Sequence, residues 1–329
     1  MPPVRAHAAP PPPRAIAAIF GPTGVGKTAV AIALADTLRA RGEAPVAVSA
    51  DALQVYEGLE RLTGAASAAE RARLEHRLVS CVPVDATFSV GEYAALAHAE
   101  IDGLLAAGRR PIVVGGSGLY LRAALADLDL RPPPPPGARE RLQGEVARSG
   151  APALHAALAE RAPWAAAGID PNDRHRIVRA LELLDAGALQ PPSGPSALWT
   201  EATRHPTVLA ALVMDREALY AAIEARVDAM VAAGAQSEVR AARAAGASPT
   251  ARKAVGFDEL LAGDIPAMKR RTRVYAKRQL TWMRKLAGAS QIDVTGRDPA
   301  DVAAHIAERL AAVDSAAAPP RSRRPDPTP

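Results

Sequence analysis

The chain of 329 residues has very little cysteine and no long apolar run, and both absences limit what it can be. Its single cysteine, Cys81, excludes an internal disulfide and a thiolate metal cluster, and it suits a reducing compartment. No stretch approaches the roughly eighteen consecutive apolar residues of a transmembrane helix. The seven histidines are scattered, with no pair at metal-ligand spacing. We therefore expect a cytoplasmic protein with no membrane-spanning helix and no protein-bound metal cluster.

Both ends of the chain have compositions typical of disorder. Residues 1–14 are rich in Pro and Ala and contain no apolar run that could act as a secretory signal. Residues 315–329 are rich in Pro, Ala and Arg. We expect a disordered leader at 1–14 and a disordered tail at 315–329.

An octapeptide near the start matches the phosphate-binding loop G-x-x-x-x-G-K-[ST]. It consists of Gly21, Pro22, Thr23, Gly24, Val25, Gly26, Lys27 and Thr28. An apolar run precedes it and a helical pattern follows it, as the motif requires. In such a loop backbone N–H groups surround an oxyanion at a helix N-terminus, Lys27 adds a positive charge and Thr28 offers a ligand for Mg²⁺. The sequence predicts that the chain binds a phosphorylated small molecule.

Short apolar runs alternate with helical periodicity along the chain. Strands are predicted at 15–20, 46–49, 110–115 and 207–214, and helices at 27–41, 68–78, 90–107, 217–233 and 266–287. This alternation predicts an α/β fold, a P-loop NTPase-like parallel sheet flanked by helices. A proline run at 131–136 interrupts the pattern. We expect the core domain at 15–130 and 191–314, and a small helical insertion domain at 131–190.

Two more predicted strands end at the edge of the sheet where the loop lies. Asp51 follows the strand at 46–49, and ligands of parallel α/β sheets bind at this edge, so Asp51 is a candidate for the reacting centre. The strand at 110–115 runs into Gly115, Gly116 and Ser117 without a carboxylate that could hold magnesium. That absence disfavours a hydrolytic ATPase, although a plain tight turn would also use these glycines.

Positive charge is concentrated in two segments of a chain whose net charge is +5. Between Lys269 and Lys285 there are many bases and no acid. On a helix, one face would carry Arg270, Arg273, Lys277, Thr281 and Arg284, beside a stripe of Tyr275, Gln279, Trp282 and Leu286. A second helix is expected after Pro171, with Arg176 and Arg179 on one face. Both faces suit a polyphosphate backbone, although a solvated surface helix would have the same composition.

The chain resembles the bacterial tRNA dimethylallyltransferases (tRNA isopentenyltransferases) from about Ile16 to Leu286. Seven segments carry the resemblance in the same order: GPTGVGKT, SADALQVYEGL, GGSGLYLRAAL, DPNDRHRIVRALE, IEARVDAMVAAG, AVGF and YAKRQLTWMRK. The resemblance implies transfer of a dimethylallyl group from dimethylallyl diphosphate to N6 of adenosine-37 in tRNAs reading codons that begin with U. Magnesium would assist, diphosphate would leave, and the anticodon stem-loop would be the bound part of tRNA. We expect a monomer.

The resemblance also implies roles for individual residues. The loop 21–28 would hold the donor diphosphate, Asp51 would take the proton of N6, and Arg226 would grip the diphosphate together with Lys27 and Thr28. The implied tRNA contacts are Asp51, Ala52, Leu53, Gln54, Ser117, Arg139, His175, Arg176, Ile177, Val178, Arg179, Arg252, Lys253, Ala254, Val255, Gly256, Phe257, Lys277, Arg278, Gln279, Leu280, Thr281, Trp282, Met283 and Arg284.

The chain departs from the family pattern at several positions. Ala52 stands where the family usually has Ser, residues 61–66 replace a G-T-A-K-P segment, residues 76–80 replace H-H-L-I-D, and Ser117 replaces a threonine while keeping its hydroxyl. The zinc finger of eukaryotic relatives is absent, so Mg²⁺ is the cofactor we expect. Two other functions stay open: a P-loop small-molecule or nucleotide kinase with residues 131–190 as a lid over ATP, and a non-catalytic RNA-binding protein.

Overall fold

The computed structural model describes residues 14–131, 133, 135–191 and 197–317. They divide into two compact units: unit 1 comprises Met1–Asp127 and Leu198–Pro329, and unit 2 is Leu128–Ala197. Unit 2 extends beyond the insertion expected at 131–190 at both ends. Most of the expected leader, 1–13, and most of the expected tail, 318–329, lie outside the described residues.

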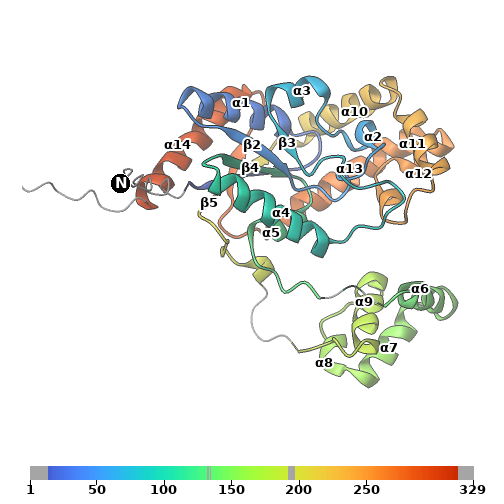
Figure 1. The fold of residues 1–329 in the computed structure, drawn as a ribbon. Coiled ribbons are helices and arrows are strands. Elements are labelled where there is room, and N and C mark those ends of the chain that lie inside the picture. The colour runs from blue at the N-terminus through green and yellow to red at the C-terminus, as the bar shows by residue number, and fades with distance from the viewer. Residues whose placement is uncertain (1–13, 132, 134, 192–196, 318–329) are drawn as a thin grey trace, which may run out of the picture. The chain divides into compact units, whose positions relative to one another are not determined.

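Unit 1 contains a sheet of six described strands, and all neighbouring strands run parallel (Figure 1). The strands are β1 (Ile16–Phe20), β2 (Pro45–Ser49), β3 (His76–Arg77), β4 (Arg110–Gly115), β5 (Thr207–Val213) and β6 (Ser290–Asp293), in the spatial order β3-β2-β4-β1-β5-β6. Every residue of β1 and β2 is buried, as expected for a parallel sheet covered on both faces. The predicted α/β parallel sheet is confirmed.

Helices cover both faces of this sheet. Those of unit 1 are α1 (Lys27–Ala40), α2 (Glu60–Thr63), α3 (Ala68–Arg73), α4 (Val90–Ala106), α5 (Gly118–Leu125), α10 (Arg216–Ala232), α11 (Ala235–Ala244), α12 (Phe257–Ala262), α13 (Ile265–Met283) and α14 (Pro299–Ala317). Helices α1 and α14 pack together on one face, and α4 and α5 pack on the other (Figure 1). Alternate strand residues such as Ala17 and Ile19 face the core of α1 and α14, as the strand period of two requires. A second apolar core around Tyr56, Phe257 and Met268 joins α2 and α10 to α13.

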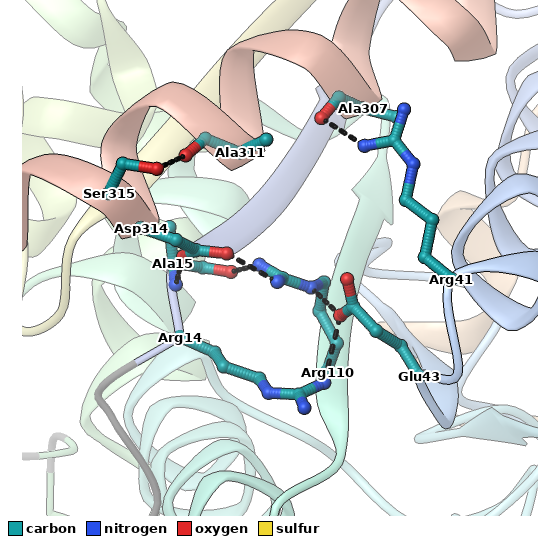
Figure 2. Close-up of polar contacts among 9 residues, drawn as sticks. All are labelled: Arg14, Ala15, Arg41, Glu43, Arg110, Ala307, Ala311, Asp314 and Ser315. Atoms are coloured by element: carbon teal, nitrogen blue, oxygen red, sulfur yellow. Dashed lines mark hydrogen bonds and ion pairs between the residues drawn. The ribbon is translucent and has the colours of Figure 1, made fainter. Parts of the chain in front are cut away.

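A buried arginine ties the amino ends of β1 and β4 to the last helix (Figure 2). Arg110 is 2% exposed, donates to the carbonyl oxygen of Ala15 at 2.6 Å and to the carboxylate of Asp314 at 2.6 Å, and pairs with Glu43. Burial lowers the pKa of Arg110, but the hydrogen bonds to Glu43 and Asp314 outweigh it, so the net pKa is raised and the group stays charged. Asp314 also accepts from the backbone N–H of Ala15 at 2.7 Å.

The described residues of unit 2 form helices and loops. The unit contains α6 (Ala138–Ser149), α7 (Ala151–Arg161), α8 (Pro163–Ala166) and α9 (Arg174–Asp185) around an apolar core that includes Leu158 and Ile177. Glu182 is fully buried in this unit and accepts hydrogen bonds from Arg139 at 2.7 and 2.9 Å and from Arg179 at 3.2 Å. Burial raises the pKa of Glu182, and the two arginines lower it by more, so the carboxyl stays ionised.

Several elements differ from the sequence-based expectations. The helix expected at 68–78 ends at Arg73, because residues 75–77 pair with β2: the N–H of Ala47 donates to the carbonyl of Glu75 at 2.8 Å. The sequence analysis predicted no strand at Ser290–Asp293, where the structure has the short edge strand β6. The expected tail starts too early, since α14 continues to Ala317 and the side chain of Ser315 bonds back to Ala311 at 2.8 Å. No helix in the described ranges is long and apolar enough to cross a membrane.

Candidate active site

The phosphate-binding loop connects β1 to α1 at the carboxyl edge of the sheet. Gly24 and Gly26 have φ angles of 86° and 91°, in the left-handed region where side chains with a Cβ are strained. Gly26 is the residue before the first turn of α1, and the macrodipole of that helix favours an anion in front of it. The loop predicted from residues 21–28 therefore has the backbone that phosphate binding requires.

Backbone carbonyl groups of the loop hold the side chain of Lys27 in place. Its Nζ donates to the carbonyl oxygens of Gly21 and Pro22, each at 2.9 Å. The pKa of Lys27 is lowered to about 7, first by burial and then by the charge of Arg226, while Asp51 opposes the shift. An added anion would favour the charged form of Lys27, so this site is electrostatically prepared for one.

Arg226 reaches the same region from α10. Its Nη2 donates to the carbonyl oxygen of Gly64 at 3.1 Å, and its buried Nε has no hydrogen-bond partner within the described chain. Burial lowers the pKa of Arg226, while Asp51 and Glu70 oppose the shift. A buried donor left without a partner is costly, and a bound anionic ligand would satisfy it. Gly64 is needed here, because a Cβ at that position would lie 1.8 Å from Nη2.

Asp51 follows β2 and is fixed by the turn after it. Its Oδ1 accepts from the N–H of Leu53 at 3.0 Å, and the N–H of Ala52 donates to Ser117 Oγ at 3.4 Å. Among the described residues no partner uses Oδ2 of Asp51. Ser117 thus supports the backbone at Ala52, the position where the family usually has Ser.

Gln279 of α13 joins the loop to the end of β4. Its Oε1 accepts from the N–H of Thr23 at 2.8 Å and its Nε2 donates to the carbonyl of Gly116 at 2.9 Å. A Cβ at Gly116 would lie 2.2 Å from that nitrogen, and a Cβ at Gly115 would lie 2.0 Å from the carbonyl oxygen of Ala50. The glycines at 115 and 116 therefore permit close approach, which is more than a tight turn requires.

These residues line one cavity of about 860 Å³ in unit 1. Its wall includes Lys27, Thr28, Asp51, Gln54, Arg226 and Gln279, so the structure brings together the phosphate loop and the predicted catalytic residues. Within the described ranges no group of three His, Cys, Asp or Glu residues could hold a metal ion. The candidate protein ligand for Mg²⁺ in this cavity is the hydroxyl of Thr28. One protein ligand is compatible with Mg²⁺, because this ion usually takes most of its ligands from phosphate oxygens and water.

Two parts of the wall were not predicted. Tyr275 lines the cavity, and burial, then the nearby Asp51, raise the pKa of its hydroxyl. Its spacing of four from Gln279 could have identified it, since both share one helix face. Residues 61–66, which differ from the family pattern, also line the cavity wall. The carboxylate of Glu238 fixes the start of this segment by accepting hydrogen bonds from the N–H groups of Arg61 and Leu62 at 2.9 and 2.8 Å.

The basic helix α13 carries two kinds of cation. In its first half Lys269 pairs with Asp228 at 2.7 Å, Arg271 pairs with Glu259, and Arg273 pairs with Glu224. In its second half and just beyond it, exposed cations form no ion pair within the described residues: Lys277, Arg278, Arg284 and Lys285. Arg278 lies over the ring of Tyr275, 5.6 Å from the centroid.

Several implied tRNA contacts are buried. The side chains of Ile177 and Val178 lie in the core of unit 2, and those of Ala254 and Phe257 lie in the second core of unit 1. Gln279 and Met283 are buried on α13. In contrast, His175, Arg176, Arg252, Lys253 and the unpaired cations of α13 are exposed. In these stretches the exposed residues are the ones whose side chains can reach an RNA.

The chain was compared with known proteins and structures. Residues 54–286 match the family model described as IPP transferase. The chain is 42% identical to the tRNA dimethylallyltransferase of Rhodospirillum centenum over 85% of its length and 92% of the relative. It is also 42% identical to that of Anaeromyxobacter dehalogenans, over 88% of its length and 98% of the relative.

Two solved structures resemble the fold. The full-length tRNA isopentenylpyrophosphate transferase of Bacillus halodurans superposes with a TM-score of 0.65 at 31% identity, covering 92% of this chain and 99% of that one. A eukaryotic dimethylallyltransferase acting on tRNA superposes with a TM-score of 0.70 at 22% identity, covering 94% and 82%. The second likeness shows the fold alone.

Proposed function

Because this chain belongs to the IPP transferase family of tRNA dimethylallyltransferases, we propose that it transfers a dimethylallyl group from dimethylallyl diphosphate to N6 of adenosine-37. The acceptors are tRNAs that read codons beginning with U, and the products are N6-isopentenyladenosine and diphosphate. The observation that carries the proposal is the single cavity in which the phosphate loop, Arg226 and Asp51 meet. A kinase would leave the unpaired cations of α13 unexplained, and a passive RNA-binding protein would leave Asp51 and Arg226 without a role.

The donor diphosphate lies in the loop 21–28, where it meets the N-terminus of α1 and the charges of Lys27 and Arg226. Breaking the allylic C–O bond builds negative charge on the departing diphosphate, and these groups stabilise that charge. Mg²⁺ would be held by the hydroxyl of Thr28 together with phosphate oxygens, and it would supply further neutralisation of charge. The buried and unpartnered Nε of Arg226 supports this part of the proposal.

The acceptor amine is a weak nucleophile, because its lone pair is delocalised into the purine. Asp51 accepts a proton from N6 as the new C–N bond forms, and its second oxygen is available for this among the described contacts. A stacked base cannot reach a cavity of this kind, so the adenine is turned out of the anticodon loop into it. The exposed cations of α13 and of α9 hold the RNA backbone.

Incubating the protein with unmodified tRNA, dimethylallyl diphosphate and Mg²⁺ should produce isopentenyladenosine, detected by mass spectrometry after digestion. Asp51→Asn keeps the shape of the side chain but removes the base, so turnover should fall about 10²-fold or more while donor binding survives. Asp36→Asn makes the same change on the exposed surface of α1 and serves as the control. Phosphorylated product with ATP in place of the prenyl donor, and no prenylated RNA, would establish a kinase instead.

A further inference from the structure

A pair of tryptophans lies on unit 1 next to the unpaired cations of α13. The ring centroids of Trp199 and Trp282 are 4.8 Å apart with their planes tilted by 42°, and Nζ of Lys285 lies 5.3 Å from the centroid of Trp199. Trp199 is 36% exposed, so part of the ring faces solvent.

The pair is anchored from behind. Trp282 packs against Gly118 at the start of α5, where a Cβ would lie 2.3 Å from its ring. Trp199 packs against the ring of Trp282, and the ammonium group of Lys285 lies over the ring of Trp199. These two contacts orient Trp199. Exposed Trp164 of unit 2, by contrast, has no ring or cation partner within the described residues. A fixed ring that is partly open to solvent loses little conformational entropy when a flat ligand stacks on it.

The surroundings specify the chemistry of that ligand. Lys285 lies beside the pair, and Arg284 precedes it in the sequence. Neither cation has an ion-pair partner in the described chain, which favours a polyanion. Aromatic rings combined with cations bind single-stranded nucleic acid, because every base offers a π-face and every linkage a negative charge. On α13, Trp282 lies two turns after Tyr275, which lines the cavity, so the ring that supports Trp199 belongs to a helix of the cavity wall.

We propose that Trp199, supported by Trp282 and Lys285, stacks on an unpaired nucleobase of the anticodon loop while the reacting base occupies the cavity. This inference rests on the proposed function, since it takes the RNA substrate as its ligand. Trp199 is then a binding residue that positions the loop and takes no part in the chemistry. It lies outside the stretches that the family resemblance implied.

The test compares Trp199→Ala and Trp199→Phe with the parent, using an unmodified anticodon stem-loop. Trp199→Ala should weaken RNA affinity about tenfold, measured by fluorescence anisotropy, and leave donor affinity unchanged. Trp199→Phe keeps a ring and should recover most of the affinity. Leu96→Ala removes another exposed apolar side chain, on α4, and should bind RNA like the parent.

Stem-loops with one abasic nucleotide at a time locate the stacked base. At that position the abasic RNA should bind the parent about tenfold more weakly and should show no further loss with Trp199→Ala. Unchanged affinity of Trp199→Ala, or equal losses for Ala and Phe in variants that melt like the parent, would overturn the assignment. A parent that binds the stem-loop but forms no isopentenyladenosine would overturn the proposed function instead, so the two failures are distinguishable.

Discussion

The bases along α13 are used differently at its two ends. In the first half Lys269, Arg271 and Arg273 are neutralised by acids from α10 and α12, and only exposed Arg270 forms no ion pair in the described chain. Lys277 in the second half and Arg284 just beyond the helix have no ion-pair partner in the described chain. The comparison teaches that a cluster of bases in the sequence does not identify a nucleic-acid surface. A base is available to bind a nucleic acid only where the fold places no acid next to it.

Unit 2 repeats the contrast on a smaller scale. Arg139 and Arg179 both bind the buried carboxylate of Glu182, whereas the side chain of Arg176 is 69% exposed and forms a longer ion pair, at 3.5 Å, with Asp173. The hydrogen bonds to Glu182 fix the orientation of the Arg139 and Arg179 side chains. These two arginines would therefore contact RNA without losing much further conformational freedom. Arg176 is more exposed and less restrained than these two arginines, so it would lose more conformational freedom on binding.

The largest effect is expected where an unpaired cation is also buried. Arg226→Ala should reduce kcat/KM about 10²- to 10³-fold, because it removes a donor aimed at the charge that develops on diphosphate. Single-turnover kinetics with saturating tRNA would measure the loss. Arg216→Ala removes an exposed arginine from the same helix and should have little effect. Equal rates for Arg226→Ala and the parent would mean that this cation serves the fold alone.

A matched pair of double variants tests the two halves of α13 directly. Lys277→Ala with Arg284→Ala should weaken tRNA binding about tenfold and reduce the slope of log K against log salt by about 1.5. Arg271→Ala with Arg273→Ala removes the same charge but should leave tRNA affinity nearly unchanged. It should instead lower the free energy of unfolding by about 1–3 kcal/mol, because Glu259 is left buried without its partner. If both pairs weaken tRNA binding equally, net charge alone governs affinity.

The smallest expected effect is a pH dependence that arises from Lys27. Without donor its pKa is about 7, and a bound diphosphate raises it toward the usual value near 10.5. Donor binding should therefore take up a proton above pH 7, and affinity should fall about fivefold between pH 7 and 8. Calorimetry in buffers of different ionisation enthalpy measures the proton. Lys27→Met should bind donor more weakly, with no such uptake.

The same shift has the opposite consequence for the stability of the empty protein. Between about pH 7 and 10.5 the unfolded chain holds a proton on Lys27 that the folded chain has lost. The free energy of unfolding contributed by this group therefore rises with pH across that window. Chemical denaturation of the parent and of Lys27→Met at several pH values isolates the contribution.

The sequence predicted the parts of this molecule that depend on local pattern. The loop at 21–28 has its own motif, and the strands at 15–20, 46–49, 110–115 and 207–214 are continuous apolar runs, so both were found. The meeting of Asp51 with the loop followed from the rule that ligands bind at the carboxyl edge of parallel strands. For Arg226 the family resemblance was the signal.

Other features depend on contacts between distant residues and had no local signal. Residues 75–77 join the sheet only because β2 offers its edge to them. The family resemblance implied that Gln279 contacts tRNA. In the structure its buried side chain forms hydrogen bonds with Thr23 and Gly116, which lie far from it in the sequence, and so connects the phosphate loop to the end of β4. The pairing of Arg271 with Glu259 depends likewise on how α12 and α13 pack. Such contacts exist only once the tertiary structure has formed.

The tie between Arg110, Asp314 and Ala15 has a consequence for the order in which a nascent chain can fold. The apolar side of α1 packs against α14, whose Val302, Ile306 and Leu310 are almost fully buried. Because α14 follows the other described elements in the chain, the apolar surface that it covers on α1 and on the sheet stays exposed until residues 299–317 have been synthesised. A chain that stops before Pro299 would leave this apolar surface open to chaperones and proteases.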